Sequence, residues 1–247
     1  MRYKITVEYD GEKFCGWQRQ LSDRTVQQTL EEALEKLGIK TVVTASGRTD
    51  SGVHAAGQVA HFDAECSIPT DKFPLAVNAY LPDDVSVTEC EIVSDGFNAR
   101  FDAKRKTYCY RLYYSRVRHP LLEKNHTHVT VEPNENAMRH AAEYIVGEHD
   151  FKCFEASGSK VKSTVRTVYS LEIKTGELKG AKTYEIYVTG NGFLYNMVRI
   201  IAGTLYYVGI GKLSPDDVKE IIKKKKRVGA GKTMPPKGLT LEEVFYQ

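Results

Sequence analysis

The chain has 247 residues, a formal net charge of +3 and a pI near 8.4, with 41% hydrophobic and 27% charged residues. This is the composition of an ordinary globular protein, and it excludes a disordered or fibrous chain. The apolar runs are too short for a bilayer, which needs about 20 apolar residues, and a strand-like N-terminus leaves no room for a signal peptide. We therefore expect a cytoplasmic protein of one large domain or two smaller ones, whose mild basic charge permits a nucleic-acid partner.

In the first half, residues 3–9 alternate apolar and polar side chains, which is typical of a strand with one buried face. Thr25 and Gln28 have the spacing of a capping box in front of a helical apolar pattern, and Gly38 is placed to end that helix. The expected order is a strand over 3–9, a helix over 26–37, strands over 41–46 and 58–64, a short helix over 71–80 and a strand over 85–92.

The second half of the sequence also predicts a mixture of strands and helices. Ser214, Pro215 and Asp217 have the spacing that opens a helix, with a capping residue and proline at the first helical position. The apolar stretch over 193–211 is too aromatic and too rich in glycine for a membrane span, so it predicts a buried helix. The expected order is a strand over 106–115, a helix over 134–146, two antiparallel strands over 166–176 and 183–193, the buried helix and the helix after Ser214.

Strands and helices are interleaved in both halves, and no low-complexity linker separates them. The sequence therefore predicts an α/β (α+β) protein of two closely joined subdomains, each with a mixed or antiparallel sheet and helices packed on it. We place the subdomains at residues 1–104 and 105–247.

The five cysteines are widely spaced and contain no C-x-x-C pair. They indicate neither a disulfide framework nor a zinc site. A different metal site remains open, because Asp50, His54 and His61 could surround an ion if this segment were helical, which would favour a metal-dependent hydrolase.

The segment "SGRTDSGVHAAGQVAHFDA", Ser46 to Ala64, places Asp50 in a crowded turn between an arginine and a glycine. An aspartate in such a position often caps a helix or closes an Asx turn. A catalytic role is also open, because a neighbouring cation favours the ionised carboxylate even when it is partly buried. Such an aspartate could act as a nucleophile or base without a cofactor.

The motif "GRTDSGVHA" resembles the signature of the TruA-type tRNA pseudouridine synthases. Seven further segments are similar to that family in the expected order: "EYDGEKFCGWQRQ", "TVQQTLEEAL", "GQVAHFD", "FNARFDAKRKTYCYRLYY", "GEHDFKCF", "GNGFLYNMVRIIAGTL" and "PPKGLTLEEVFY". The likeness covers nearly the whole chain. It differs from some relatives at Ser51, where they carry alanine.

The resemblance implies the pseudouridine synthase fold, with the active-site cleft between the two subdomains. It implies isomerisation of uridine to pseudouridine at positions 38, 39 and 40 of the anticodon stem-loop of tRNAs. The bond from uracil N1 to ribose C1′ breaks and the base rejoins through C5, so no cofactor or metal is needed. Family members act on a flipped-out base. They are homodimers, so the resemblance implies a homodimer here, and from the short apolar runs we expect no membrane partner.

The resemblance also assigns roles to individual residues. Asp50 matches the essential aspartate, and Tyr108 matches the aromatic ring that stacks on the uracil. Arg199 matches an arginine that pairs with the catalytic aspartate, and Arg48 one that contacts the RNA and holds the flipped nucleotide.

Basic residues just before Tyr108 provide a predicted entrance to the site. Lys104, Arg105 and Lys106 are expected to contact RNA phosphates, which supply much of the affinity of such complexes. A non-catalytic RNA-binding module remains the alternative function, because a tyrosine-rich strand on a small sheet also binds single-stranded RNA.

Overall fold

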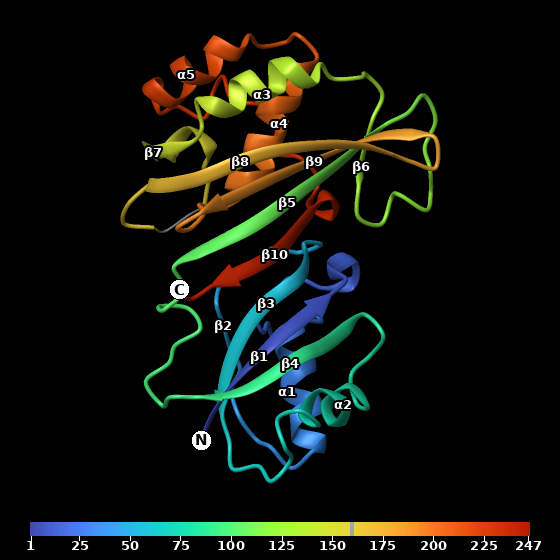
Figure 1. Cartoon of the computed structure of the whole chain (residues 1–247), viewed down its shortest axis with the longest axis vertical. Helices are drawn as coiled ribbons and strands as arrows, with labels where there is room; N and C mark the ends of the chain where they lie inside the picture. The colour runs from blue at the N-terminus through green and yellow to red at the C-terminus, as the bar shows by residue number, and fades with distance from the viewer. Residues whose placement is uncertain (159–160) are drawn as a thin grey trace. The chain divides into compact units, whose positions relative to one another are not determined.

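The computed structural model describes residues 1–158 and 161–247. The chain forms two compact units: Met1–Lys104 together with Thr240–Gln247, and Arg105–Leu239. Each unit contains a β-sheet with helices packed on it (Figure 1). The predicted α/β class is confirmed. None of the described helices has the length and apolar character needed to cross a bilayer.

The sheet of the first unit has the order β4-β1-β3-β10, and β2 pairs with β3. Its antiparallel centre is β1 against β3 and β4, and alternate residues of β1 are buried as the sequence pattern predicts. The strands are β1 (Arg2–Tyr9), β2 (Thr44–Ala45), β3 (His54–Asp63), β4 (Val85–Val93) and β10 (Leu239–Phe245).

Two predicted strands differ in length from those observed. The strand expected over 41–46 is reduced to Thr44–Ala45, because the Val43 N–H donates to the Glu31 carboxylate at 3.0 Å instead of to a neighbouring strand. The next strand begins at His54, four residues before the prediction, where β1 on one side and β10 on the other extend the pairing.

The helices of the first unit are the 3-10 helix η1 (Gly11–Lys13), α1 (Val26–Lys36) and α2 (Phe73–Asn78). The capping box expected at Thr25 and Gln28 is wrong. Thr25 is the N-cap residue, but its side chain makes no capping hydrogen bond. The N–H groups of Val26 and Gln27 instead donate to the carbonyls of Gly16 and Trp17, at 3.3 and 3.0 Å. Carbonyl groups of a neighbouring segment therefore accept the hydrogen bonds of the N–H groups in the first turn of α1.

The last eight residues group with the first unit, whereas the sequence analysis placed them in the second. β10 pairs in parallel with β3, with Thr240 opposite His54 and Leu241 opposite Ala55. The approach is close at Gly57, where a Cβ would lie 2.3 Å from the Glu242 carbonyl oxygen. The sequence pattern of a single strand does not reveal which sheet it joins, so this pairing could not be predicted from it.

The sheet of the second unit has the order β5-β9-β8-β7, and β6 pairs with β5. The predicted antiparallel pair is present as β8 and β9, and β5 runs antiparallel to β9. The strands are β5 (Arg105–Tyr114), β6 (Thr127–Val129), β7 (Gly147–Asp150), β8 (Val165–Leu178) and β9 (Ala181–Gly190).

The helices of this unit are α3 (Glu135–Glu143), η2 (Phe151–Phe154), α4 (Met197–Gly209), α5 (Pro215–Lys224) and η3 (Pro236–Gly238). Figure 1 shows α3, α4 and α5 gathered on one side of the β8-β9 pair. The capping box at Ser214 and Asp217 is confirmed, with Pro215 at the first helical position. The apolar stretch forms the buried helix α4, as predicted.

Candidate active site

Asp50 lies in the loop between β2 and β3 of the first unit. The Val53 N–H donates to the Asp50 carbonyl at 3.1 Å, and Gly52 has a φ of +77°, so the backbone itself closes the turn. The Asp50 side chain is half-buried and Arg48 is exposed. The chain thus presents a partly desolvated carboxylate on a tight turn, with a guanidinium two residues before it.

The segment Phe14–Trp17 runs directly behind this turn. The Trp17 N–H donates to the Thr49 carbonyl at 3.1 Å, and the Gly52 N–H donates to the Phe14 carbonyl at 3.2 Å. Gly16 has a φ of +85°, and a Cβ there would lie 2.5 Å from the Thr49 carbonyl oxygen. Only glycine allows the two backbones to approach this closely.

The Ser51 hydroxyl donates to the same Phe14 carbonyl at 3.3 Å. Phe14 is fixed in turn by Arg24, whose guanidinium lies 4.1 Å from the ring centroid and forms a bidentate ion pair with Asp84. The hydroxyl at Ser51 therefore adds one more bond between the aspartate turn and the segment behind it.

A buried network of polar side chains also stabilises this turn. The hydroxyls of Tyr9 and Thr49 are 2.7 Å apart, and the Gln58 amide donates to the Gly47 carbonyl at 2.9 Å. The Ser46 hydroxyl donates to the Gln58 side-chain oxygen at 2.7 Å. Burial raises the pKa of Tyr9 to about 12, so its hydroxyl stays protonated at neutral pH. Both flanks of the Asp50 turn are thus anchored to β1 and β3.

The three residues of the metal-site hypothesis, Asp50, His54 and His61, do not form a set of metal ligands in this structure. His54 opens β3 and its Nδ1 accepts from the Gly11 N–H at 3.1 Å, while His61 Nδ1 accepts from the Ala99 N–H at 3.1 Å. His54 and His61 lie on strand β3 and Asp50 lies in the loop before it, so the three residues do not share a helical face. Among residues 1–158 and 161–247, no group of three or more His, Cys, Asp or Glu side chains could hold a metal.

In the second unit, Tyr108 and Tyr110 differ although they are two residues apart on β5. Tyr110 is fully buried, and its hydroxyl donates to the Pro235 carbonyl at 2.7 Å and lies 2.7 Å from the Thr127 hydroxyl. Burial raises the pKa of Tyr110. Tyr108 is half-buried and meets Phe193 edge to face, with the ring centroids 5.2 Å apart. Of the two rings, Tyr108 has the exposure that a stacking residue requires.

Arg199 lies in the first turn of α4, within a run of buried apolar residues. Its Nε donates to the Met234 carbonyl at 2.7 Å, and its Nη1 donates to the Asn196 side-chain oxygen at 2.5 Å. Asn196 is the N-cap and has a left-handed backbone with a φ of 60°. These two bonds fix the plane of the guanidinium. A charge in such apolar surroundings requires partners of this kind.

Close backbone packing positions the segment that carries Met234. A Cβ on Gly203 of α4 would lie 2.0 Å from the Lys232 carbonyl oxygen, so the helix touches the 231–234 segment directly. The Gly231 N–H donates to the Thr204 hydroxyl at 2.8 Å. The geometry at Arg199 thus depends on glycines that the sequence analysis did not single out.

The remaining predicted residues are basic and solvent-accessible. Lys104 and Arg105 are exposed, and Lys106 is half-buried opposite Gly190 of β9. The Lys104 N–H donates to the Phe245 carbonyl at 2.8 Å. The candidate residues of the first unit are Arg48, Asp50 and Lys104, and those of the second are Arg105, Lys106, Tyr108 and Arg199.

Sequence reasoning missed several residues that shape these two regions. Gly16, Tyr9 and Gln58 support the Asp50 turn, and Asn196 and Met234 hold Arg199. Most of them fall inside the segments that carry the family resemblance. Their presence there was the available signal, but their roles depend on contacts between distant parts of the chain.

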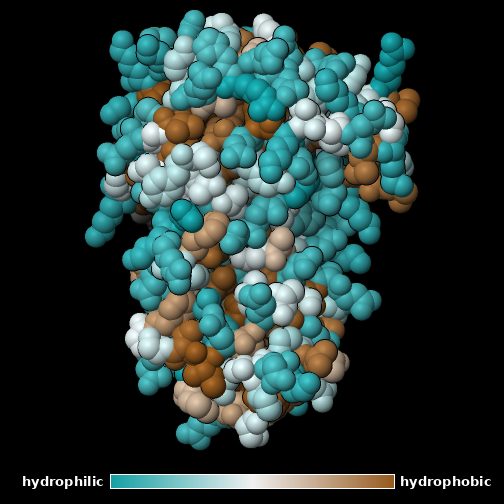
Figure 2. Space-filling model, in the orientation of Figure 1, coloured by the Kyte–Doolittle hydropathy of each residue, from teal (hydrophilic) through white to brown (hydrophobic). Residues whose placement is uncertain are grey.

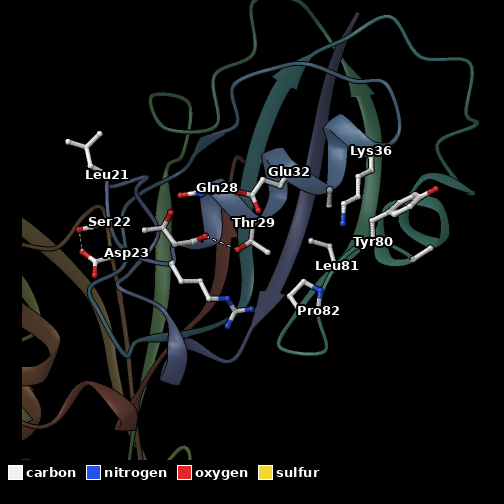
Figure 3. A pocket seen from close by; sticks show the side chains of 14 residues that line it. Leu21, Ser22, Asp23, Gln28, Thr29, Glu32, Lys36, Tyr80, Leu81 and Pro82 are labelled. Atoms are coloured by element: carbon white, nitrogen blue, oxygen red, sulfur yellow. Dashed lines mark hydrogen bonds between the residues drawn. The ribbon is translucent and has the colours of Figure 1, made fainter.

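A groove of about 670 Å³ lies elsewhere on the first unit. Figure 3 shows its side chains, which come from the segment before α1, from α1 itself and from the segment after α2. It is lined by charged residues such as Glu32 and Lys36 together with Tyr80. None of the predicted site residues contributes to it.

The chain belongs to the tRNA pseudouridine synthase family, whose model matches residues 5–102 and 141–247. The resemblance seen in the sequence is confirmed, and the predicted enzyme class, an isomerase, is confirmed with it. Three relatives are each called tRNA pseudouridine synthase A. The protein of Bacillus subtilis (strain 168) is 49% identical over 251 residues, covering 100% of this chain and 99% of the relative. That of Ruminiclostridium cellulolyticum is 47% identical, covering 99% of each chain. That of Caldicellulosiruptor bescii is 46% identical, covering 98% of each chain.

Proposed function

We propose that this protein isomerises uridine to pseudouridine at positions 38, 39 and 40 in the anticodon stem-loop of tRNAs. Membership of the tRNA pseudouridine synthase family supports the reaction. The observation that carries the assignment to this site is the Asp50 turn, whose backbone is held by a neighbouring segment and a buried polar network and which carries one half-buried carboxylate. Such rigidity is what a group that must meet a flipped base requires.

Asp50 is the essential carboxylate of this reaction. The N1–C1′ bond breaks, the uracil turns while it stays in the pocket, and a C5–C1′ bond forms. The C5 proton is then lost to a base or to water, and N1 carries a proton in the product. No atom is gained or lost overall, so the reaction needs no redox partner or group donor.

The family resemblance assigns further roles to Tyr108 and Arg199. Tyr108 stacks on the uracil, and its hydroxyl is the candidate base that takes the C5 proton. The family resemblance assigns to Arg199, which Met234 and Asn196 hold, the role of pairing with Asp50 and keeping it ionised. Arg48, two residues before Asp50, contacts the RNA backbone and holds the flipped nucleotide.

RNA binding rests on backbone charge and shape. Lys104, Arg105 and Lys106 contact phosphates at the entrance, which allows tRNAs of different sequence to bind. The protein works as a homodimer in the cytoplasm, where its tRNA substrates are found.

The test is release of tritium from unmodified tRNA labelled at uridine C5. We expect the wild-type chain to release tritium in the presence of a chelator. Asp50→Asn should lower the rate by about 10³-fold or more, because it removes the reacting carboxylate while keeping its size. A matched control is Asp71→Asn, whose side chain is 71% exposed in front of α2 and which should leave the rate unchanged.

Two results would contradict the proposal. Turnover that survives Asp50→Asn would remove the carboxylate from the mechanism. Tight tRNA binding without any tritium release by the wild-type chain would favour the RNA-binding module, and loss of release with chelator alone would favour a metal enzyme.

A further inference from the structure

The short turn Asn98–Asp102 follows β4 in the first unit and precedes the basic residues before β5. It closes on itself through four hydrogen bonds. The Asn98 side-chain oxygen accepts from the N–H groups of Arg100 and Phe101 at 2.9 and 3.1 Å. The Asn98 N–H donates to the Asp102 carboxylate at 2.7 Å, and the Asp102 N–H donates to the Asn98 carbonyl at 3.0 Å. The turn therefore has one defined conformation.

Three side chains from distant strands hold the same turn. Tyr246 donates its hydroxyl to the Ala99 carbonyl at 2.7 Å, and His61 accepts from the Ala99 N–H at 3.1 Å. Arg2 donates to the Phe97 carbonyl at 2.8 Å and forms a bidentate ion pair with Asp63. Ala99 itself is fully buried. The turn is thus fixed to β1, β3 and the segment after β10.

Phe101 projects from this rigid turn into solvent. Its side chain is 77% exposed, and no other phenylalanine in the described part of the chain is exposed. On the face shown in Figure 2, hydrophobic side chains form small separate groups among hydrophilic ones, so an isolated apolar residue is not unusual in itself. What sets Phe101 apart is that hydrogen bonds within the turn and from His61 and Tyr246 hold its backbone, while the ring is exposed to solvent.

A cation lies beside the ring, and the one carboxylate of the turn, that of Asp102, accepts a hydrogen bond from the Asn98 N–H. The Arg100 guanidinium lies 5.6 Å from the Phe101 ring centroid, and Lys104, three residues further on, is exposed. An aromatic face beside cations fits a nucleobase whose phosphate lies nearby, because the ring stacks on the base and the cations neutralise the backbone.

We propose that Phe101 is a second stacking platform of this enzyme, which receives an unpaired nucleobase of the tRNA outside the position assigned to Tyr108. This inference rests on the proposed function, because it takes RNA as the ligand. Stacking on Phe101 is tolerant of sequence, since every base has an aromatic face. It strengthens binding of the RNA and takes no part in the bond changes at the target uridine.

The first test compares Phe101→Ala with Leu75→Ala, an exposed apolar residue of α2 at 70% exposure. We expect Phe101→Ala to weaken binding of unmodified tRNA about tenfold, the size of one lost stacking contact. Its KM should rise by the same factor with kcat unchanged. The slope of log Kd against log salt should stay the same, whereas Arg100→Gln should reduce the slope by about one contact. Leu75→Ala should bind as the wild type.

The second test observes the contact directly with the Phe101→Trp variant. The chain has one native tryptophan, Trp17, which is 3% exposed, so the added indole reports from the turn. We expect its fluorescence to be quenched when unmodified tRNA is added, and tRNA affinity to remain at the wild-type level. The Leu75→Trp variant is the matched control and should show no quenching.

The proposal is overturned if Phe101→Ala binds tRNA within twofold of the wild type, or if the fluorescence of Phe101→Trp is unchanged at saturating tRNA. It is also overturned if Phe101→Ala alters only the oligomeric state, because the ring would then contact a second copy of the chain. These outcomes are separate from failure of the proposed function, which is the absence of tritium release by a wild-type chain that still binds tRNA.

Discussion

The Asp50 region of the first unit and the Arg199 region of the second are held in different ways. The Asp50 turn is fixed chiefly by backbone hydrogen bonds to a segment that approaches at Gly16. Arg199 is fixed by its own side chain, which donates to the Met234 carbonyl and to Asn196. The aspartate side chain is short, so the position of its carboxylate is set by the position of the backbone. An arginine side chain is long and flexible, so hydrogen bonds to the guanidinium itself must fix its position.

Gly16→Ala gives the strongest test of this difference. The added Cβ would meet the Thr49 carbonyl at 2.5 Å on a backbone with a φ of +85°. We expect a loss of more than about 3 kcal/mol in the free energy of unfolding, from left-handed strain of about 1–2 kcal/mol plus the displaced backbone. Activity should fall further than stability explains, because the turn that carries Asp50 moves. Urea unfolding and tritium release measure the two effects.

Gly38→Ala is the matched control. Gly38 has a φ of +80°, but nothing lies within 4 Å of its added Cβ. Only the strain remains, so we expect a cost of about 1 kcal/mol and normal kcat. Equal effects at both glycines would show that the approach at Gly16 is unimportant.

The pair Tyr108→Phe and Tyr110→Phe sharpens the comparison within the second unit. Tyr110→Phe leaves the buried Pro235 carbonyl and Thr127 hydroxyl without their partner, so we expect a loss of about 1–3 kcal/mol of stability with kcat unchanged. Tyr108→Phe should cost less stability than Tyr110→Phe because Tyr108 is only half-buried, and it should keep tRNA affinity but slow product formation. If the two variants had the same profile, the division of roles would be wrong.

The smallest expected effect is a pH dependence of stability in the first unit. Burial, followed by the nearby charge of Arg2, lowers the pKa of His61 from its ordinary value of 6.5, although Asp63 and Asp102 oppose this shift. The folded chain then binds fewer protons than the unfolded chain, so stability falls as the pH drops below about 6.5. Unfolding at pH 7.5 and 5.5 should show a smaller difference for His61→Gln than for the wild type.

Much of the fold could be predicted from the sequence, because hydrophobic periodicity and helix-capping residues depend only on residues close together in the chain. The buried helix over 193–211 and the capping box at Ser214 appear in the structure. The capping box at Thr25 does not, because the carbonyls of Gly16 and Trp17 supply acceptors that no local pattern reveals. Local rules fail where a distant segment satisfies the same hydrogen bonds.

The candidate site shows the same limit. Periodicity cannot separate Tyr108 from Tyr110, since residues two apart on a strand face the same way. The structure separates them by burial and by the partners of the Tyr110 hydroxyl. The support that Gly16 gives to Asp50 was equally hidden, because it depends on two segments more than thirty residues apart meeting at van der Waals distance.

The placement of β10 has a consequence for how the chain is made. The second unit is continuous in the chain, over Arg105–Leu239, so all of its strands and helices have been translated before Thr240 is added. The first unit is translated earlier but lacks the strand beside β3 until Thr240–Gln247 emerge. Thr240–Gln247 follow the whole second unit in the chain and must return to the sheet that contains β1 and β3, which is a loop closure over residues 105–239. A truncation before Thr240 would leave the unit that carries Asp50 without β10.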